Sequence, residues 1–386
     1  MSEFFPKVLI VSEGYGRTLY GVAQVLLRLT QYLLKKSINY RLLVAKIRSA
    51  PKQHEAHVYS LPSSRFSKLL NWHLKQKRFI IDNFLDFAPD IIHIHGIFTF
   101  IQRHSIQVAL KKNVPCLLSP HGMLEPWIWQ QKGKFVFRLK RLIWIFFLKP
   151  TIGRVDYLHA ITKIESDTLT REFPNIPQIQ IPNAVDIDEF AQEQIEPQKN
   201  RFFLFLGRLH PVKAVDILIK AFVTSNLQNF HLVLAGPDSD PAYSTQLKTM
   251  VSDLGISSKV SFVGPVMGSE KSDFLRNAWC TVVPSYSEVM AMVNLESAAS
   301  FTPTITTTKT GLDDWEESGG LLIEPNLSSL TNALLKTANW TVPERLQRGL
   351  QSRRLVEKRY CWEIVGNQWV DTYQMMAQST GKKHGK

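Results

Sequence analysis

Short apolar runs alternate with longer amphipathic stretches along nearly the whole chain. The runs are four to seven residues long and rich in β-branched and aromatic residues, as buried strands are. We expect strands at residues 7–11, 40–45, 90–95, 114–119, 155–161, 178–181, 201–206, 231–234, 260–263, 279–283 and 304–308. We expect helices at residues 22–36, 65–87, 214–222 and 344–374, and from about residues 164, 242, 273 and 292. Strands that alternate with helices predict an α/β chain with parallel sheets in both halves.

A polar stretch with a proline, residues 191–200, interrupts this rhythm and is typical of a linker. We therefore expect a first domain at residues 1–190 and a second at 200–360. We expect the rest, 361–386, to be a helix that packs back on the first domain. A chain of 386 residues is long enough for two such cores.

The composition is that of a globular protein, with 44% hydrophobic and 20% charged residues. The net charge of +13 is uneven, because residues 1–183 carry 26 Lys and Arg against 11 Asp and Glu, while residues 184–386 carry 20 against 22. This asymmetry predicts an anionic partner for the first half only. Three widely spaced cysteines suggest a reducing compartment. We see no secretion signal, and the longest strongly apolar run, 142–148, is too short to span a bilayer, so we expect a cytoplasmic protein.

Candidate chemistry begins at the ends of the predicted strands. Glycines 14, 16 and 21 follow the first strand, but Lys46 stands where a dinucleotide site needs an acid. Gly21 is therefore better explained by a close approach of backbone to another kind of ligand. His93 and His95 share one face of a strand and lack a nearby third ligand, so we expect no metal.

The strand at 114–119 delivers His121, Glu125 and Trp127 at its C-terminal end, where ligands of open parallel sheets bind. In the second half, Arg208 and Lys213 occupy the corresponding place after the strand at 201–206, and both suit phosphate oxygens. A diphosphate leaving group needs such neutralising charge.

Glu288 and Glu296 flank the start of a predicted helix. Their spacing of eight residues is close to two helical turns and is expected to turn both toward one cleft. Carboxylates accept hydrogen bonds from hydroxyls, and a helix start offers free N–H groups to phosphate. This combination is typical of a site for a ligand that carries sugars and phosphates.

Residues 132–149 form a strongly basic apolar stretch, with seven cations and no acid from 126 to 155. On a regular helical wheel, Phe135, Leu139, Leu142, Ile143 and Phe146 form the stripe expected to face the core. The opposite side would present Phe137, Lys140, Arg141, Trp144 and Leu148. Bulky apolar residues ringed by cations favour contact with an anionic membrane surface. A helix buried on both sides, or one that meets a partner protein, is the alternative.

Taken together, these motifs resemble those of the family-4 retaining glycosyltransferases of the GT-B fold. The similarity runs in order along nearly the whole chain, from Tyr20-Gly21 to the C-terminal helices. Its motifs are Pro120-His121-Gly122-Met123, Asn183-Ala184-Val185-Asp186, Gly207-Arg208 with Lys213, and Pro284-Ser285 with Glu288 and Glu296.

The resemblance implies two Rossmann-like domains whose parallel sheets face a central cleft, with C-terminal helices crossing back to the first domain. It implies that the second domain binds a nucleotide-sugar donor and the first an acceptor. Arg208 and Lys213 would hold the diphosphate, Glu288 the sugar and Glu296 the ribose, and His121 would reach the sugar or phosphate near the reacting carbon. The implied donor site is completed by Gly21, Asn183, Ala291 and Met292, and the acceptor side by His95, His121, Glu125 and Trp127. No cofactor and no metal are implied, because the nucleotide-sugar is itself the substrate.

The sequence departs from the family pattern in four respects. Val289-Met290-Ala291 replaces the usual Gly-Phe-Gly, Ala184 and Ala214 replace glycines, and Trp279 stands where an acid is common. The functional side chains are all present, so we predict an active enzyme.

The basic stretch suggests that the acceptor is a lipid-linked saccharide or oligosaccharide at the inner face of the cell membrane, as in transferases that build bacterial surface polysaccharide or lipopolysaccharide. The alternatives are a catalytically decayed transferase that serves as a membrane-associated binding or assembly protein, and a sugar phosphorylase or epimerase on the same fold. Nucleic-acid binding is disfavoured, because no known binding module is recognisable.

Overall fold

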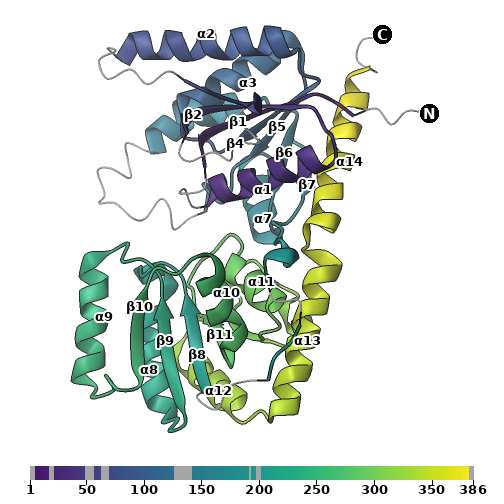
Figure 1. Cartoon of the computed structure of the whole chain (residues 1–386). Coiled ribbons are helices and arrows are strands. Elements are labelled where there is room, and N and C mark those ends of the chain that lie inside the picture. Colours follow the sequence, from purple (N-terminus) through teal and green to yellow (C-terminus); the bar gives the residue numbers. More distant parts are fainter. Residues whose placement is uncertain are drawn as a thin grey trace. The chain divides into compact units, whose positions relative to one another are not determined.

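The computed structural model describes residues 5–16, 21–47, 56–61, 69–125, 141–190, 193–196 and 201–381. The chain divides into two compact units (Figure 1). Unit 1 comprises Met1–Pro182 and Val365–Lys386, and unit 2 comprises Asn183–Ile364. Each unit has its own parallel sheet with helices on both faces, so the predicted pair of Rossmann-like domains is confirmed.

Unit 1 is built on a seven-stranded sheet of order β3-β2-β1-β4-β5-β6-β7, in which neighbouring strands are parallel. Its strands are β1 (Val8–Tyr15), β2 (Tyr40–Ile47), β3 (Val58–Ser60), β4 (Ile91–His95), β5 (Cys116–Ser119), β6 (Tyr157–Ala160) and β7 (Gln178–Gln180). Its helices are α1 (Val22–Lys35), α2 (Leu69–Phe87), α3 (Phe100–Lys112), the π-helix η2 (Trp144–Leu148), α6 (Lys149–Ile152), α7 (Lys163–Glu172) and, from Val365 onward, α14 (Trp362–Gly381).

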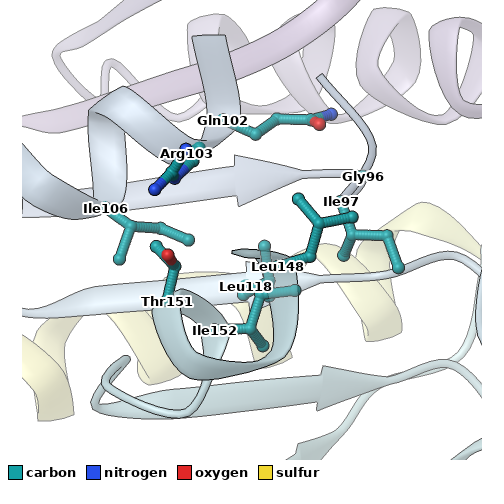
Figure 2. A pocket seen from close by; sticks show the side chains of 9 residues that line it. All are labelled: Gly96, Ile97, Gln102, Arg103, Ile106, Leu118, Leu148, Thr151 and Ile152. Carbon is teal, nitrogen blue, oxygen red and sulfur yellow. The ribbon is translucent and has the colours of Figure 1, made fainter. Parts of the chain in front are cut away.

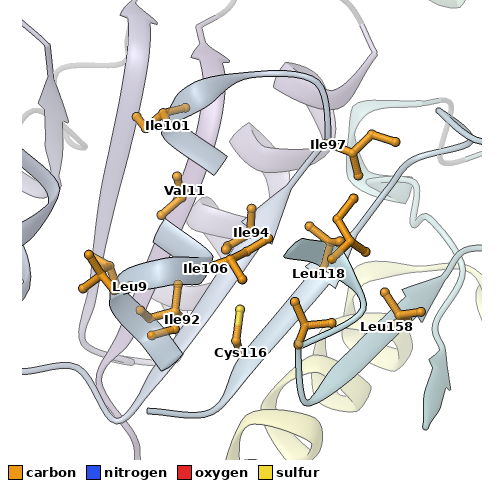
Figure 3. Packing of buried hydrophobic residues seen from close by; sticks show 14 of the residues in the cluster. Leu9, Val11, Ile92, Ile94, Ile97, Ile101, Ile106, Cys116, Leu118 and Leu158 are labelled. Carbon is orange, nitrogen blue, oxygen red and sulfur yellow. The ribbon is translucent and has the colours of Figure 1, made fainter. Parts of the chain in front are cut away.

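The core of unit 1 lies between the central strands and the helices that cover them. Leu9, Ile92 and Ile94 of the sheet pack with Ile101 and Ile106 of α3 in one cluster of buried side chains (Figure 3). Each such side chain contributes about 1.5–3 kcal/mol when it is fully buried. β4 and β5 are buried along their whole length, and ligands of open parallel sheets bind beyond the C-terminal ends of such strands.

Unit 2 has a six-stranded parallel sheet of order β10-β9-β8-β11-β12-β13. The strands are β8 (Arg201–Leu206), β9 (Phe230–Ala235), β10 (Val260–Gly264), β11 (Cys280–Val283), β12 (Thr304–Thr307) and β13 (Leu321–Ile323). The helices are η3 (Ile187–Glu189), η4 (Pro211–Lys213), α8 (Val215–Ser225), α9 (Pro241–Asp253), α10 (Gly268–Asn277), α11 (Met292–Ala299), η5 (Trp315–Ser318), α12 (Leu327–Ala338) and α13 (Val342–Arg359).

Unit 2 begins at Asn183, ahead of the boundary that composition suggested. The backbone N–H of Val185 donates to Tyr360 O at 2.8 Å, and Ser272 Oγ donates to Glu189 O. These bonds attach residues 185–189 to the second core. The long helix expected at 344–374 is also two helices, α13 and α14, because Tyr360 and Cys361 leave the helix to bond with Val185.

The prediction that Trp144 and Leu148 face the membrane is wrong. Trp144 is only 6% exposed and its ring lies against Phe173, and Leu148 packs on the core. Phe146, expected to face the core, is 67% exposed. The wheel grouped these residues correctly, because Leu142, Ile143 and Phe146 are exposed together while Trp144 and Leu148 turn inward together, but the prediction assigned the wrong group to the core. Phe137 and Lys140 of the same prediction lie outside the described residues.

Within the described residues, no helix combines the length and apolar character needed to cross a bilayer.

Candidate active site

In unit 2, the predicted cations and Glu288 come from loops that follow neighbouring strands. Arg208 and Lys213 lie in the loop after β8, and Glu288 lies in the loop after β11. The two loops are joined by a hydrogen bond from the backbone N–H of Tyr286 to Val212 O at 2.9 Å. Carboxyl ends of adjacent parallel strands meet at one edge of the sheet, so these side chains share that edge.

Lys213 and Glu288 form an ion pair through Glu288 Oε1, and the two side chains are 18% and 17% exposed. Ser285 Oγ donates to the same carboxylate oxygen at 2.8 Å. Ser285 is itself fixed, because Thr307 Oγ1 donates to its backbone carbonyl at 2.6 Å. Lys213 keeps two further N–H donors and Glu288 a second oxygen for a ligand. The pair can therefore hold an anion and a hydroxyl of one molecule together.

The loop after β8 depends on close backbone packing against the loop after β9. Gly207 N–H donates to Ala235 O at 2.9 Å, and Leu209 N–H donates to Pro237 O at 3.0 Å. A Cβ on Gly236 would stand 1.8 Å from Gly207 O, so only glycine fits there. Arg208 lies between these two bonded residues, so its backbone is fixed while its side chain is exposed.

The segment that replaces the family's glycines is attached to the next loop. Glu288 N–H donates to Lys309 O at 2.8 Å and Ala291 N–H donates to Thr310 O at 3.1 Å. The Ala291 amide is thus used within the protein. Met292 opens α11, so its N–H is among the first amides of the helix, which have no partner inside it.

Glu296 lies on α11 and forms an ion pair with Lys271 of α10, with 2.6 Å from Nζ to Oε1. Asn183 and Gly21 are placed at the start of unit 2 and before α1, respectively. Trp127 lies outside the described residues.

Unit 1 places His95, His121 and Glu125 after β4 and β5. His95 Nδ1 and His121 Nε2 are 2.8 Å apart, and the rings stack with centroids at 5.1 Å. His121 adopts a left-handed backbone conformation, with φ of 55°, which costs a non-glycine residue about 1–2 kcal/mol. Burial, with a further contribution from His159, lowers the pKa of His121 to about 3, so His121 is neutral at pH 7.

Close to these residues, Tyr373, His93, Ser119 and His159 form a chain of hydrogen bonds in which each group donates to the next. His159 Nε2 must donate to the Ile181 carbonyl at 2.8 Å, so His159 Nδ1 accepts from Ser119 Oγ. Ser119 Oγ then accepts from His93 Nε2, and His93 Nδ1 accepts from Tyr373 Oη, each at 2.8 Å. This direction requires neutral histidines, and burial lowers the pKa of both His93 and His159 so that they are neutral at pH 7.

Glu165 is a site residue that sequence reasoning missed. Its side chain is buried and accepts the backbone N–H of Gly122 at 2.5 Å and that of Ile161 at 2.8 Å. Burial raises the pKa of Glu165 to about 7. Glu165 anchors the turn that carries His121. The Thr162-x-x-Glu165 pattern, a helix-capping signature, was the available signal.

A cavity of unit 1 lies between α3 and α6 (Figure 2). Its walls are mainly apolar, with Ile97, Ile106, Leu118 and Leu148, and Arg103 at one side. Its volume of about 10 Å³ is close to the minimum needed to hold one water molecule, about 10–15 Å³. We assign no ligand to it. Among the described residues, no group of three or more His, Cys, Asp or Glu could hold a metal ion.

Comparison with known proteins agrees with both units. The profile of Glycosyltransferase Family 4 matches residues 20–189, and that of Glycosyl transferases group 1 matches residues 186–340. The chain belongs to glycosyltransferase family 4. A relative of this family, the D-inositol 3-phosphate glycosyltransferase of Rhodococcus opacus, is 28% identical over 267 residues, which are 61% of this chain and 57% of that protein. The chain thus spans little more than half the length of the curated relatives it matches.

Solved structures of other glycosyltransferases place the family-4 chain in the GT-B fold. Anabaena HepE, solved in complex with UDP and glucose, superposes with a TM-score of 0.73 at 15% identity and covers 96% of this chain and 100% of its own. WaaG, a glycosyltransferase involved in lipopolysaccharide biosynthesis, superposes with a TM-score of 0.69 at 16% identity, over 95% of this chain and 99% of its own.

Proposed function

We propose that the chain transfers a sugar, with retention of configuration, from a nucleoside-diphosphate sugar to a saccharide acceptor. The observation that carries this proposal is the Lys213–Glu288 ion pair, held by Ser285 at the edge of the unit 2 sheet. Lys213 and the exposed Arg208 offer donors to a diphosphate, and Glu288 offers an acceptor to the hydroxyls of the attached sugar. The Lys213–Glu288 pair would then hold the diphosphate and the sugar, the two groups joined by the bond that breaks.

The developing charge on the leaving diphosphate is met by these cations and by the N-terminus of α11. Fixed cations and dipoles need no reorganisation during the reaction, which is the main source of electrostatic catalysis. His121 is neutral and so serves as a hydrogen-bond partner to a hydroxyl, not as a cation for phosphate. The roles proposed for Arg208, Lys213 and His121 do not require a resident metal or cofactor.

The donor site is tested by thermal denaturation with UDP, GDP, ADP, dTDP and CMP. At about a hundred times its dissociation constant, a ligand of the folded state adds about 2.7 kcal/mol of stability. We expect one nucleoside diphosphate to raise the midpoint, and Arg208→Ala and Lys213→Met to remove the rise. Lys220→Ala, an exposed cation of α8, is the matched control and should keep it. If no nucleotide changes the midpoint, the decayed-transferase alternative is preferred.

We further propose that the acceptor is lipid-linked and met at the inner membrane face, where the protein is peripheral. The support is an exposed apolar surface made of Leu142, Ile143, Ile145, Phe146 and Phe147, next to the exposed cation Arg141. This surface belongs to the half of the chain that carries the excess positive charge. Apolar side chains beside cations suit the boundary between head groups and acyl chains of an anionic bilayer.

Sedimentation with vesicles of phosphatidylglycerol and phosphatidylcholine tests this surface. We expect binding at low salt, a marked loss in Phe146→Glu/Phe147→Glu, and weaker binding as salt rises, because screening shortens the reach of the cations. Leu335→Glu, an exposed apolar residue of unit 2, is the control and should bind normally. Binding that the double substitution leaves unchanged would rule out this surface but not the donor site.

A further inference from the structure

Lys271 and Glu296 form an ion pair that the predicted donor chemistry does not explain. The distance from Lys271 Nζ to Glu296 Oε1 is 2.6 Å, and the side chains are 27% and 17% exposed. Lys271 belongs to α10, which follows β10, and Glu296 belongs to α11, which follows β11. The pair therefore joins the two helices that flank this part of the sheet edge.

The position of Lys271 in its own helix is electrostatically poor. It is the fourth residue of α10, which begins at Gly268, so its ammonium lies near the positive end of the helix dipole. A cation is disfavoured there unless a carboxylate compensates for it, and Glu296 supplies that carboxylate. The Lys271–Glu296 pair therefore links α10 and α11 at a defined position.

We infer that Lys271 is a positioning residue: it fixes the Glu296 carboxylate to receive a ribose diol, and so gives the site its preference for ribonucleotides over 2′-deoxyribonucleotides. This inference rests on the proposed function. A carboxylate has about four acceptor positions on two oxygens, so Oε1 can bond Lys271 while Oε2 accepts the hydroxyls. A glutamate without the ion pair samples several rotamers, and its oxygens would meet the two hydroxyls less often.

Nucleotide titrations on the whole chain test the inference. The probes are the nucleoside diphosphate that binds the unchanged protein and its 2′-deoxy form, UDP and 2′-deoxy-UDP for a uridine site. We expect the unchanged protein to bind the ribonucleotide about tenfold more tightly. Lys271→Met keeps the apolar stem and should weaken UDP binding severalfold while leaving 2′-deoxy-UDP binding nearly unchanged, so that the preference largely disappears. Lys271→Arg keeps the charge and should restore it.

Lys248→Met is the matched control, because it removes another lysine–carboxylate pair of unit 2, that with Asp238 at 3.5 Å. It should leave the preference intact. Lys271→Gln provides a second neutral variant should Lys271→Met fold poorly. A preference retained in both neutral variants, or equal binding of the two nucleotides by the unchanged protein, would overturn the inference and leave the donor site standing. Absence of any nucleotide binding by the unchanged protein would overturn both.

Discussion

Glu288 is a side chain whose usefulness depends on its neighbours. Lys213 and Ser285 both bond Oε1, so the carboxylate is turned in one direction. A serine three residues before an acid is common in loops. Here the Ser285 hydroxyl helps to fix the orientation of the Glu288 carboxylate.

Ser285→Ala tests that orientation. We expect nucleotide-sugar binding to weaken about fivefold, since a hydrogen bond of this kind contributes about 1 kcal/mol. Binding of the nucleoside diphosphate alone should not change, because it carries no sugar to meet Glu288. Isothermal titration of both ligands measures the difference, with Ser239→Ala, which loses a bond to Leu209 O, as the control. Equal weakening of both ligands would show that Ser285 acts on the loop and not on Glu288.

Ala214 is a second residue at which the local conformation decides the outcome. It caps α8 in a left-handed conformation with φ of 53°, the region that favours glycine. The left-handed region costs alanine about 1–2 kcal/mol, and glycine in its place loses about 0.5–1 kcal/mol of chain entropy. We therefore expect Ala214→Gly to stabilise unit 2 by about 0.5–1 kcal/mol in urea denaturation. A lower midpoint would mean that the packing of the buried Ala214 methyl outweighs the backbone term.

At the scale of elements, the buried strands could be predicted from sequence, whereas the partly exposed edge strands β3 and β13 and the buried face of residues 142–148 could not. The buried strands stand out as β-branched runs, and the residues after β5, β8 and β11 fell where the parallel-sheet rule expects a ligand. Helices α3 and α12 were missed, and in α3 the polar residues obscure the helical period. Its start is marked by Gln102, which accepts the Thr99 N–H and also bonds His95 O. In residues 142–148 both faces of the helix are apolar, so the pattern separates the two faces but does not indicate which one is buried.

The histidine chain of unit 1 predicts loss of stability in acid. Burial lowers the pKa of His159 to about 4 and of His121 to about 3, against 6.5 in the unfolded chain. The folded state thus binds fewer protons than the unfolded state below pH 6.5, so stability is complete above 6.5 and falls as the pH drops toward 4. Glu165 acts in the opposite direction, since its raised pKa of about 7 favours the folded state at lower pH.

Burial also raises the pKa of Glu125, but the four buried histidines 93, 95, 121 and 159 outnumber the two carboxyls, so the net effect below pH 6 is destabilising. Urea midpoints between pH 7.5 and 4.5 should fall with pH, and Glu165→Gln should make the fall steeper because it removes one opposing group. A flat profile would mean that the cluster opens to water and titrates normally.

At the scale of the whole molecule, unit 1 is discontinuous in sequence, because α14 completes it from the far end of the chain. Val365, Trp369, Tyr373 and Met376 of α14 are all buried. Tyr373 begins the hydrogen-bond chain through His93, so the last helix also orders the residues that support His121. The C-terminal helix is therefore part of the fold of unit 1 and not an appendage.

Gly366 is the point at which this packing can be tested. A Cβ there would stand 2.4 Å from the Tyr32 ring of α1, whose hydroxyl donates to Asn367 at 2.8 Å. Glycine inside a helix costs about 0.5–1 kcal/mol, yet overpacking costs about 1–3 kcal/mol, so close approach outweighs propensity. We expect Gly366→Val to destabilise unit 1 by about 2 kcal/mol and to speed hydrogen exchange in β4 and β5, while amides of β8 and β11 exchange as before. Gln368→Val, an exposed position on the same helix, should change neither set. Faster exchange in both units would mean that they unfold as one cooperative body, and the two cores would then share their stability.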